Sequence, residues 1–202
     1  MQHDEPRLVL ASESRTRRAL LQAAGLRFEA RPARIDEEAV KRAALSESIP
    51  PAEAALLLAE LKAERVAMRE PDALVIGADQ LLVCEGSWFD KPGSLAGARD
   101  QLRALRGRPH TLFTAVLCHG GGRPVWVHVA EPRLTMRPFS DAFLDAYLAG
   151  EGEALMSSVG AYRLEGLGAM LFDRIEGDHF SILGLPLLPL LGFLRQHGVL
   201  MG

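Results

Sequence analysis

A long apolar run with one acidic residue inside it constrains this chain more than any other stretch. Residues 74–83 read Leu-Val-Ile-Gly-Ala-Asp-Gln-Leu-Leu-Val, so the apolar run leads up to Asp79 and resumes after Gln80. A continuous apolar run of this kind is typical of a strand that is buried on both faces of a sheet. An ionised carboxylate is rarely buried unless a metal, a cation or hydrogen bonds compensate for its lost hydration. The sequence therefore predicts a central strand in which Asp79 has either a structural hydrogen-bond role or a functional one.

A tight turn after this strand brings a lysine back toward it. Glu85 and Gly86 are typical of a hairpin turn, and the returning segment reaches Lys91 five residues later. A lysine that the hairpin brings back toward the strand raises the odds that the carboxylate of Asp79 has a functional role.

Strand-like and helix-like segments alternate along the rest of the chain, as they do in α/β proteins. The expected strands cover residues 7–11, 26–30, 74–83, 111–119, 124–136 and 169–175. The expected helices are one that ends at Gly25 and four over residues 52–68, 95–105, 141–148 and 185–197, with a loop at 151–156 and a turn at 176–178. We predict α/β layers around one mixed sheet, in a single domain over residues 1–202 or in one domain with a small lobe.

Composition excludes several classes of function. The net charge is -3 and there is no basic block, so we do not expect nucleic-acid binding. No apolar stretch reaches the roughly 18 uncharged residues that a membrane span needs. The first residues include Asp4 and Glu5 and do not resemble a signal peptide, so a cytoplasmic location is expected. Cys84 and Cys118 both lie in apolar runs and are expected to be buried free thiols.

The first strand is followed by small polar residues and then by arginine. Ser12 or Ser14 is a plausible N-cap for the next helix, and Arg17 lies in its first turn. A helix N-terminus after a strand points backbone N–H groups at an anion. Because a cation there opposes the helix dipole, Arg17 is either a solvated surface charge or a ligand for an anion.

Two further charged positions have alternative interpretations. The acidic cluster around Glu37 could hold a divalent cation, or it could be a set of acids that begins a helix, which is the more common case. Lys62 follows Leu58 by four residues on a helix, at the edge of the buried face. It could extend along that face into solvent, or it could reach into a cleft.

Taken in order, a series of motifs resembles those of the Maf family of nucleoside triphosphate pyrophosphatases. The motifs are Leu10-Ala11-Ser12-Glu13-Ser14 with Arg17, Lys62-Ala63, Gly77-Ala78-Asp79, Lys91-Pro92, Gly160-Ala161-Tyr162, Glu165-Gly166, residues 174–178 and Gly184-Leu185-Pro186. The resemblance covers nearly the whole chain. It implies an inosine-triphosphatase-like architecture, in which helices flank an elongated mixed β-sheet and two lobes surround a central nucleotide cleft. It also implies a homodimer and a divalent metal cation, either Mg²⁺, Mn²⁺ or Co²⁺.

The family's chemistry gives each matching residue an expected role. Cleaving a nucleoside triphosphate between its α and β phosphates needs cations around the phosphates and an oriented water. The resemblance implies that the phosphates are held by Arg17, Lys62 and Lys91, with a hydrogen bond from Ser12. It implies that Asp79 is the general base, a metal ligand or both, and Glu37 is a candidate second metal ligand.

Three departures from the family pattern concern the base of the substrate. Thr16 stands where the family usually has the first of two arginines. Gln80 and Glu165 differ from the branch that acts on thymidine and uridine triphosphates, and they resemble the branch that acts on 7-methylguanosine triphosphate. Ser157 and Ser158 stand where the first branch commonly has Asp-Lys. An acidic acceptor at Glu165 suits the N–H donors of guanine, but the sequence fits neither branch fully and leaves the base open.

Two functions from different classes remain at this stage. The first is a housecleaning pyrophosphatase for non-canonical or modified nucleotides. The second is a nucleotide-binding regulator of cell division and septum formation with little turnover. The family's acidic residue argues for the enzyme, because a pure binding protein has no need of Asp79 beside phosphates. A phosphate-loop kinase or ATPase is disfavoured, since the chain has no G-x-x-x-x-G-K-[ST] motif.

Overall fold

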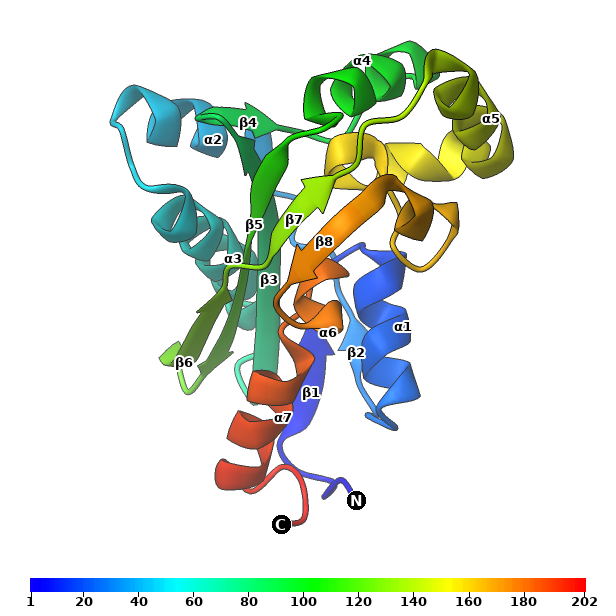
Figure 1. Cartoon of the computed structure of the whole chain (residues 1–202). Helices are drawn as coiled ribbons and strands as arrows, with labels where there is room; N and C mark the ends of the chain where they lie inside the picture. Colours follow the sequence, from blue (N-terminus) through cyan, green and yellow to red (C-terminus); the bar gives the residue numbers. More distant parts are fainter. The chain divides into compact units, whose positions relative to one another are not determined.

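A computed structural model describes all 202 residues and has a mixed β-sheet flanked by helices (Figure 1). The strands are β1 (Arg7–Leu10), β2 (Glu29–Ala30), β3 (Ala73–Cys84), β4 (Ser87–Phe89), β5 (Pro109–Gly120), β6 (Arg123–Ala130), β7 (Arg133–Met136) and β8 (Phe172–Glu176). The helices are α1 (Arg15–Ala23), α2 (Glu37–Ser46), α3 (Pro51–Ala67), α4 (Leu95–Leu105), α5 (Asp141–Glu151), α6 (His179–Ile182) and α7 (Leu187–Gln196). Three 3₁₀ helices, η1 (Gly152–Ser157), η2 (Val159–Ala161) and η3 (Leu167–Leu171), follow α5. None of the helices is both long and apolar enough to cross a membrane.

The predicted α/β class with one mixed sheet is confirmed. The strand order is β2-β1-β3-β5-β7-β8, with β4 added to β3 and β6 added to β5. The pairs β1–β2 and β1–β3 are parallel, whereas β5 pairs with β6 and β7 in the antiparallel sense. As expected, β3 is buried along most of its length.

The chain forms two compact units. The first contains residues 1–79, 114–130 and 184–202, and the second contains residues 80–113 and 131–183. The long strands β3 and β5 each contribute one part to each unit. The nucleotide cleft that the resemblance implies stays a prediction.

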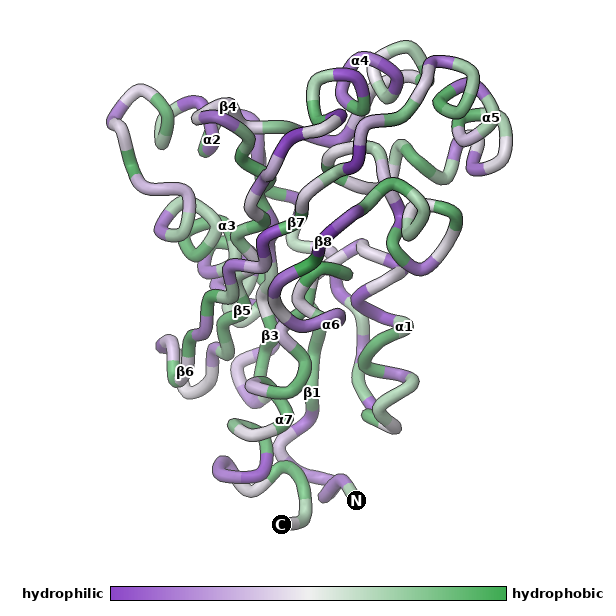
Figure 2. The backbone as a smooth tube through the Cα atoms, in the orientation of Figure 1, coloured by the Kyte–Doolittle hydropathy of each residue, from purple (hydrophilic) through white to green (hydrophobic).

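The core of the first unit contains the parallel strands, and α3 packs closely on β3. In Figure 2 the tube along β1 and α7 is mostly in the hydrophobic colour, and the apolar side chains of these elements are largely buried. A Cβ at Gly77 of β3 would lie 2.8 Å from the Cβ of Ala63 and would overlap the carbonyl oxygen of Ala59. Only glycine at this position therefore lets α3 approach so near to β3.

The second unit has its own core, formed by the 3₁₀ segments and α4 and α5 with the adjoining parts of the sheet. His110 of β5 is buried in it, with Nε2 3.0 Å from the hydroxyl oxygen of Tyr162. The ring of Tyr162 in turn packs edge-on against Phe172, at 4.9 Å between centroids.

Several expected boundaries were wrong. Residues 124–136 form two strands, because Glu131 and Pro132 interrupt the ladder where proline has no N–H to donate. Residues 151–156 are helical and not a loop, and β8 covers residues 172–176 after a 3₁₀ helix. The expected turn at 176–178 leads directly into α6, which Asp178 caps through a hydrogen bond from Ser181 N of 2.9 Å. Strand β2 covers only two residues of the expected 26–30, and α7 begins at Leu187.

Substituting Gly77 tests the close approach of α3 to β3. We expect Gly77→Ala to lower the free energy of unfolding by about 1–3 kcal/mol, because the added methyl group overpacks the contact with Ala59 and Ala63. Urea denaturation would measure the change. Gly93→Ala is the matched control, since a Cβ there meets nothing within 4 Å. Equal unfolding midpoints for the two variants would contradict the packing described here.

His110 should make stability fall in mild acid. Burial lowers the pKa of His110 from 6.5 to about 4. Between these two pH values the unfolded chain binds a proton that the folded chain does not. This contribution to stability is therefore complete above about pH 6.5 and is lost as the pH falls toward 4, by about 3 kcal/mol in total.

The free energy of unfolding, measured by urea denaturation between pH 7 and 4, tests this expectation. His110→Gln should flatten the dependence, while His3→Gln, which changes an exposed histidine, should leave it unaltered. An unchanged slope in His110→Gln would mean that another group is responsible.

Candidate active site

Asp79 is buried in β3, and its compensating cation comes from helix α3. The residue is 4% exposed, and its Oδ1 accepts a hydrogen bond from Nζ of Lys62, itself 7% exposed. The expectation that a metal, a cation or hydrogen bonds compensate a buried carboxylate is met by the cation of Lys62. Lys91 follows β4 in the second unit and is exposed.

Lys62 also contacts a second carboxylate. Its Nζ lies 2.8 Å from Oε1 of Glu37, whose side chain is 45% exposed. The neighbouring Asp36 caps α2 by accepting a hydrogen bond from Ala39 N at 3.0 Å. The interpretation of the acidic cluster as the beginning of a helix is confirmed. Its role as a ligand of a divalent cation stays a prediction.

One oxygen of Asp79 has no partner. Oδ2 is buried and makes no hydrogen bond within the protein. Leaving a buried acceptor unsatisfied typically costs on the order of 1–3 kcal/mol. An unsatisfied carboxylate oxygen beside a lysine is therefore a position where a water, a cation or a ligand donor would bind favourably.

The donors at this position suit a divalent cation that is shared with a substrate. The structure has no cluster of three or more His, Cys, Asp or Glu side chains that could hold a metal alone. It offers Oδ2 of Asp79, which has no partner, and the carboxylate of Glu37. Lys62 links the two residues, because its Nζ contacts Oδ1 of Asp79 as well as Glu37. Mg²⁺ is commonly bound by one or two carboxylates together with substrate phosphates, so the residues fit that mode of binding.

Arg17 is buried in the same unit, and its guanidinium donates hydrogen bonds to two backbone carbonyls. Its Nε donates to Gly184 O at 2.7 Å, and its Nη1 donates to Ala78 O at 2.9 Å. Burial lowers the pKa of Arg17, and the charges of Asp79 and Glu37 oppose that change. Arg17 is therefore a fixed cation that ties α1 to β3, and its Nη2 has no acceptor within the protein.

Ser12 lies beside this guanidinium. Its Oγ accepts hydrogen bonds from Ser14 N and from Nη1 of Arg17, both at 3.2 Å. A serine hydroxyl has one O–H donor besides its acceptor lone pairs, so Ser12 retains a donor for a ligand. Thr16, the second residue of α1, is half-buried.

Two of the three residues that were expected to read the base, Gln80 and Glu165, lie in the second unit, whereas Thr16 lies in the first. The amide nitrogen of Gln80 donates to the carbonyl oxygens of Ser181 and Ile182, at 3.0 and 3.2 Å. The carboxylate of Glu165 is partly exposed, and its Oε1 lies 3.4 Å from Nε of Arg163. The structure therefore brings Ser12, Arg17, Glu37, Lys62 and Asp79 together in the first unit, and it places Gln80, Lys91 and Glu165 in the second.

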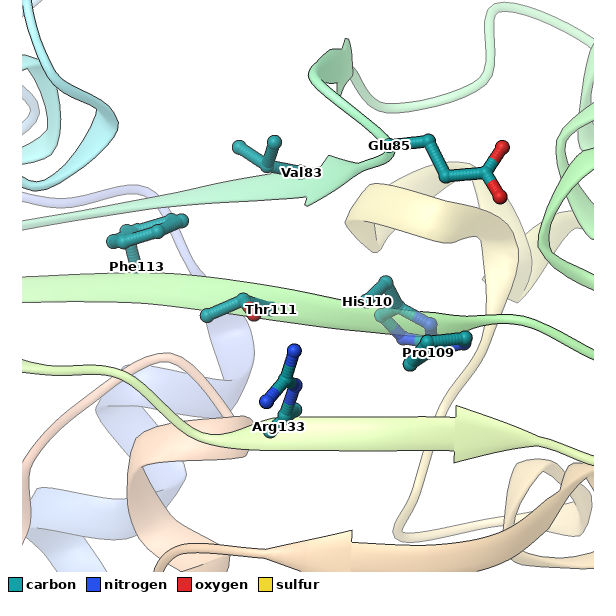
Figure 3. Close-up of a pocket in the computed structure, with 7 residues that line it drawn as sticks. All are labelled: Val83, Glu85, Pro109, His110, Thr111, Phe113 and Arg133. Carbon is teal, nitrogen blue, oxygen red and sulfur yellow. The ribbon is translucent and has the colours of Figure 1, made fainter.

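A separate pocket of about 310 Å³ opens in the second unit (Figure 3). It is lined by Val83, Glu85, Pro109, His110, Thr111, Phe113 and Arg133. None of the residues singled out from the sequence lines it.

Comparisons with known proteins identify the relatives of this chain. The family model described as Maf-like protein matches residues 7–197. A nucleoside triphosphate pyrophosphatase of Granulibacter bethesdensis is 59% identical over 96% of this chain and 98% of the relative. One of Paramagnetospirillum magneticum is 55% identical over 95% and 99%. A 7-methyl-GTP pyrophosphatase of Rhizobium meliloti is 50% identical over 97% of this chain and 98% of the relative.

Removing the lysine should destabilise the fold more than removing the pair. We expect Lys62→Met to cost about 3–5 kcal/mol of unfolding free energy, because it leaves the buried charge of Asp79 without its partner. The double variant Lys62→Met with Asp79→Asn should recover a substantial part of that loss. Urea denaturation of both would measure the coupling. A change below about 0.5 kcal/mol for Lys62→Met would contradict a buried ion pair.

Proposed function

The chain belongs to the Maf family, and on that basis we propose that it is a nucleoside triphosphate pyrophosphatase. It hydrolyses the bond between the α and β phosphates and releases a nucleoside monophosphate and pyrophosphate. The observation that carries this assignment is the carboxylate of Asp79, which a lysine fixes on one side and which keeps a buried, unsatisfied oxygen on the other.

In this mechanism Asp79 orients the attacking water. Lys62 holds Oδ1, so the carboxylate cannot rotate freely and Oδ2 is left as the acceptor for a water proton. Because a carboxylate is a weak base, its main contribution is to place the water in line with the scissile bond rather than to deprotonate it outright.

The cations and the serine of the first unit bind the phosphates. Arg17 offers Nη2 and Ser12 offers its hydroxyl proton, since their other polar atoms already have partners in the protein. Lys62 contributes a positive charge next to the reacting water. We include Lys91 of the second unit as a further phosphate ligand, because it is an exposed cation within a family motif.

We propose that a divalent cation completes the site. Asp79 would hold Mg²⁺, or Mn²⁺ or Co²⁺ in its place, with Glu37 as a second carboxylate ligand and the substrate phosphates supplying further oxygens. When bound, such an ion neutralises phosphate charge and makes a coordinated water more acidic.

The names of the relatives favour the enzyme over a nucleotide-binding regulator with little turnover, since all are pyrophosphatases. They do not select a base, because one relative is named for 7-methyl-GTP and others for nucleoside triphosphates in general. Thr16, Gln80 and Glu165 stay our predicted positions for that choice. A homodimer in the cytoplasm is the setting that we propose.

Product analysis tests the assignment. Purified protein with Mg²⁺ and a panel of nucleoside triphosphates, including 7-methyl-GTP, should yield monophosphate and pyrophosphate. We expect Asp79→Asn to lower kcat by at least about 100-fold, because the amide no longer orients and accepts from the water as a carboxylate does.

The matched control is Asp100→Asn, which changes an exposed aspartate of α4. Free phosphate as the first product would place the cleavage at a different bond. Tight nucleotide binding with no turnover on any substrate would move the assignment to the regulator.

A further inference from the structure

Glu151 is a buried carboxylate at the C-terminal end of α5, where the helix dipole disfavours an anion. Its side chain is only 5% exposed. Its Oε2 accepts from Nη1 of Arg163 at 2.9 Å, and its Oε1 accepts from the backbone N–H of Leu167 at 2.6 Å. The two hydrogen bonds offset an otherwise unfavourable position, so the carboxylate is placed to hold the segment that contains Arg163 and Leu167.

The side chain of Arg163 joins this carboxylate to the predicted base-reading residue. Nη1 contacts Glu151, while Nε lies 3.4 Å from Oε1 of Glu165. Glu151, Arg163 and Glu165 thus form a row of alternating charge on one side of the second unit. The buried end is fixed by two bonds, and the outer end is 31% exposed.

The backbone around Glu165 is held by side-chain contacts and not by the sheet. Residues 162–166 lie between η2 and η3 and belong to no strand, so no ladder of the sheet holds them. Gly166 lies against the carboxylate of Glu151: a Cβ at this position would overlap Oε1 and lie 3.3 Å from the carboxyl carbon. Glu151 is therefore one anchor of the segment that presents Glu165, beside Tyr162 and Leu164, which pack in the core.

We propose that Glu151 is a positioning residue which, through Arg163, orients Glu165 toward the nucleobase and so sets selectivity among bases. The inference rests on the proposed function and adds residues that the sequence motifs do not contain. Guanine presents two adjacent N–H donors, which a carboxylate can accept together, whereas uracil flanks its one N–H with carbonyl oxygens.

The charges of Glu151, Arg163 and Glu165 decide which base is bound more tightly. Glu151 balances Arg163, so one net negative charge remains, at Glu165. Without Glu151, the guanidinium pairs with Glu165 alone and draws its carboxylate away from a ligand. Losing Glu151 should then weaken the binding of guanine nucleotides and leave the binding of uridine triphosphate nearly unchanged.

The variant Glu151→Gln tests the proposal, because it keeps the size of the side chain and an oxygen to accept from Leu167. We expect the ratio of kcat/KM for GTP to that for UTP to fall about tenfold, mainly through a higher KM for GTP, with the same direction for 7-methyl-GTP. Glu153→Gln, an exposed glutamate of η1, is the matched control and should not change the ratio.

A double-mutant cycle tests whether Glu151 acts through Glu165. Glu165→Gln should lower the same ratio, and adding Glu151→Gln to it should lower the ratio no further if the first residue acts only through the second. Dissociation constants for GTP and UTP, measured without turnover, give the same comparison. They also keep the inference testable if the wild-type protein hydrolyses neither nucleotide, an outcome that would count against the proposed function alone.

A purely structural role for Glu151 predicts different results. Glu151→Gln would then lower kcat/KM equally for GTP and UTP, whatever its effect on the melting temperature, and the ratio would not change. An unchanged ratio overturns the proposal, as does a double variant whose selectivity loss is the sum of the two single losses.

Discussion

The buried ion pair between Lys62 and Asp79 requires close packing of a helix on a strand in the first unit. Two charges that leave water lose several kcal/mol of hydration each, and only close contact and good hydrogen bonds offset that cost. The lysine is on a helix and the aspartate is on a central strand, so the helix must lie almost in contact with the strand. Gly77, with Ala59 and Ala63 opposite it, permits that approach. The small residues at this contact are therefore part of the site, although none of them touches a substrate.

Local sequence was enough to find the carboxylate but not its partner. The apolar run around Asp79 predicted a buried strand and a need for a cation, and the structure agrees on both points. The hairpin drew attention to Lys91, because a hairpin brings residues that are near in the sequence close together in space. The true partner lies 17 residues earlier on a helix. Which helix face meets which strand depends on packing, and the only local sign of it was the glycine two residues before the aspartate.

Two other features of the structure could not be predicted from sequence patterns. Residues 124–136 looked like one strand because nearly every second residue is apolar, yet Pro132 divides them between two neighbours of β5. Glu151 gave no signal, since one glutamate near a glycine resembles any helix end. Its role follows from contacts with Arg163 and Leu167, which are 12 and 16 residues away and reach it through 3₁₀ turns. Such turns have weak sequence signatures, so the contact could be recognised only in three dimensions.

The charged side chains of the first unit's cluster balance one another in the absence of substrate. Arg17 and Lys62 carry two positive charges, and Glu37 and Asp79 carry two negative ones, so the cluster is neutral without substrate. Neutrality limits the cost of burying Arg17, Lys62 and Asp79 in the free protein, while Glu37 is 45% exposed. A triphosphate, however, brings several negative charges that a neutral cluster cannot offset. The divalent cation that we propose on the unsatisfied oxygen of Asp79 would supply that positive charge together with the substrate.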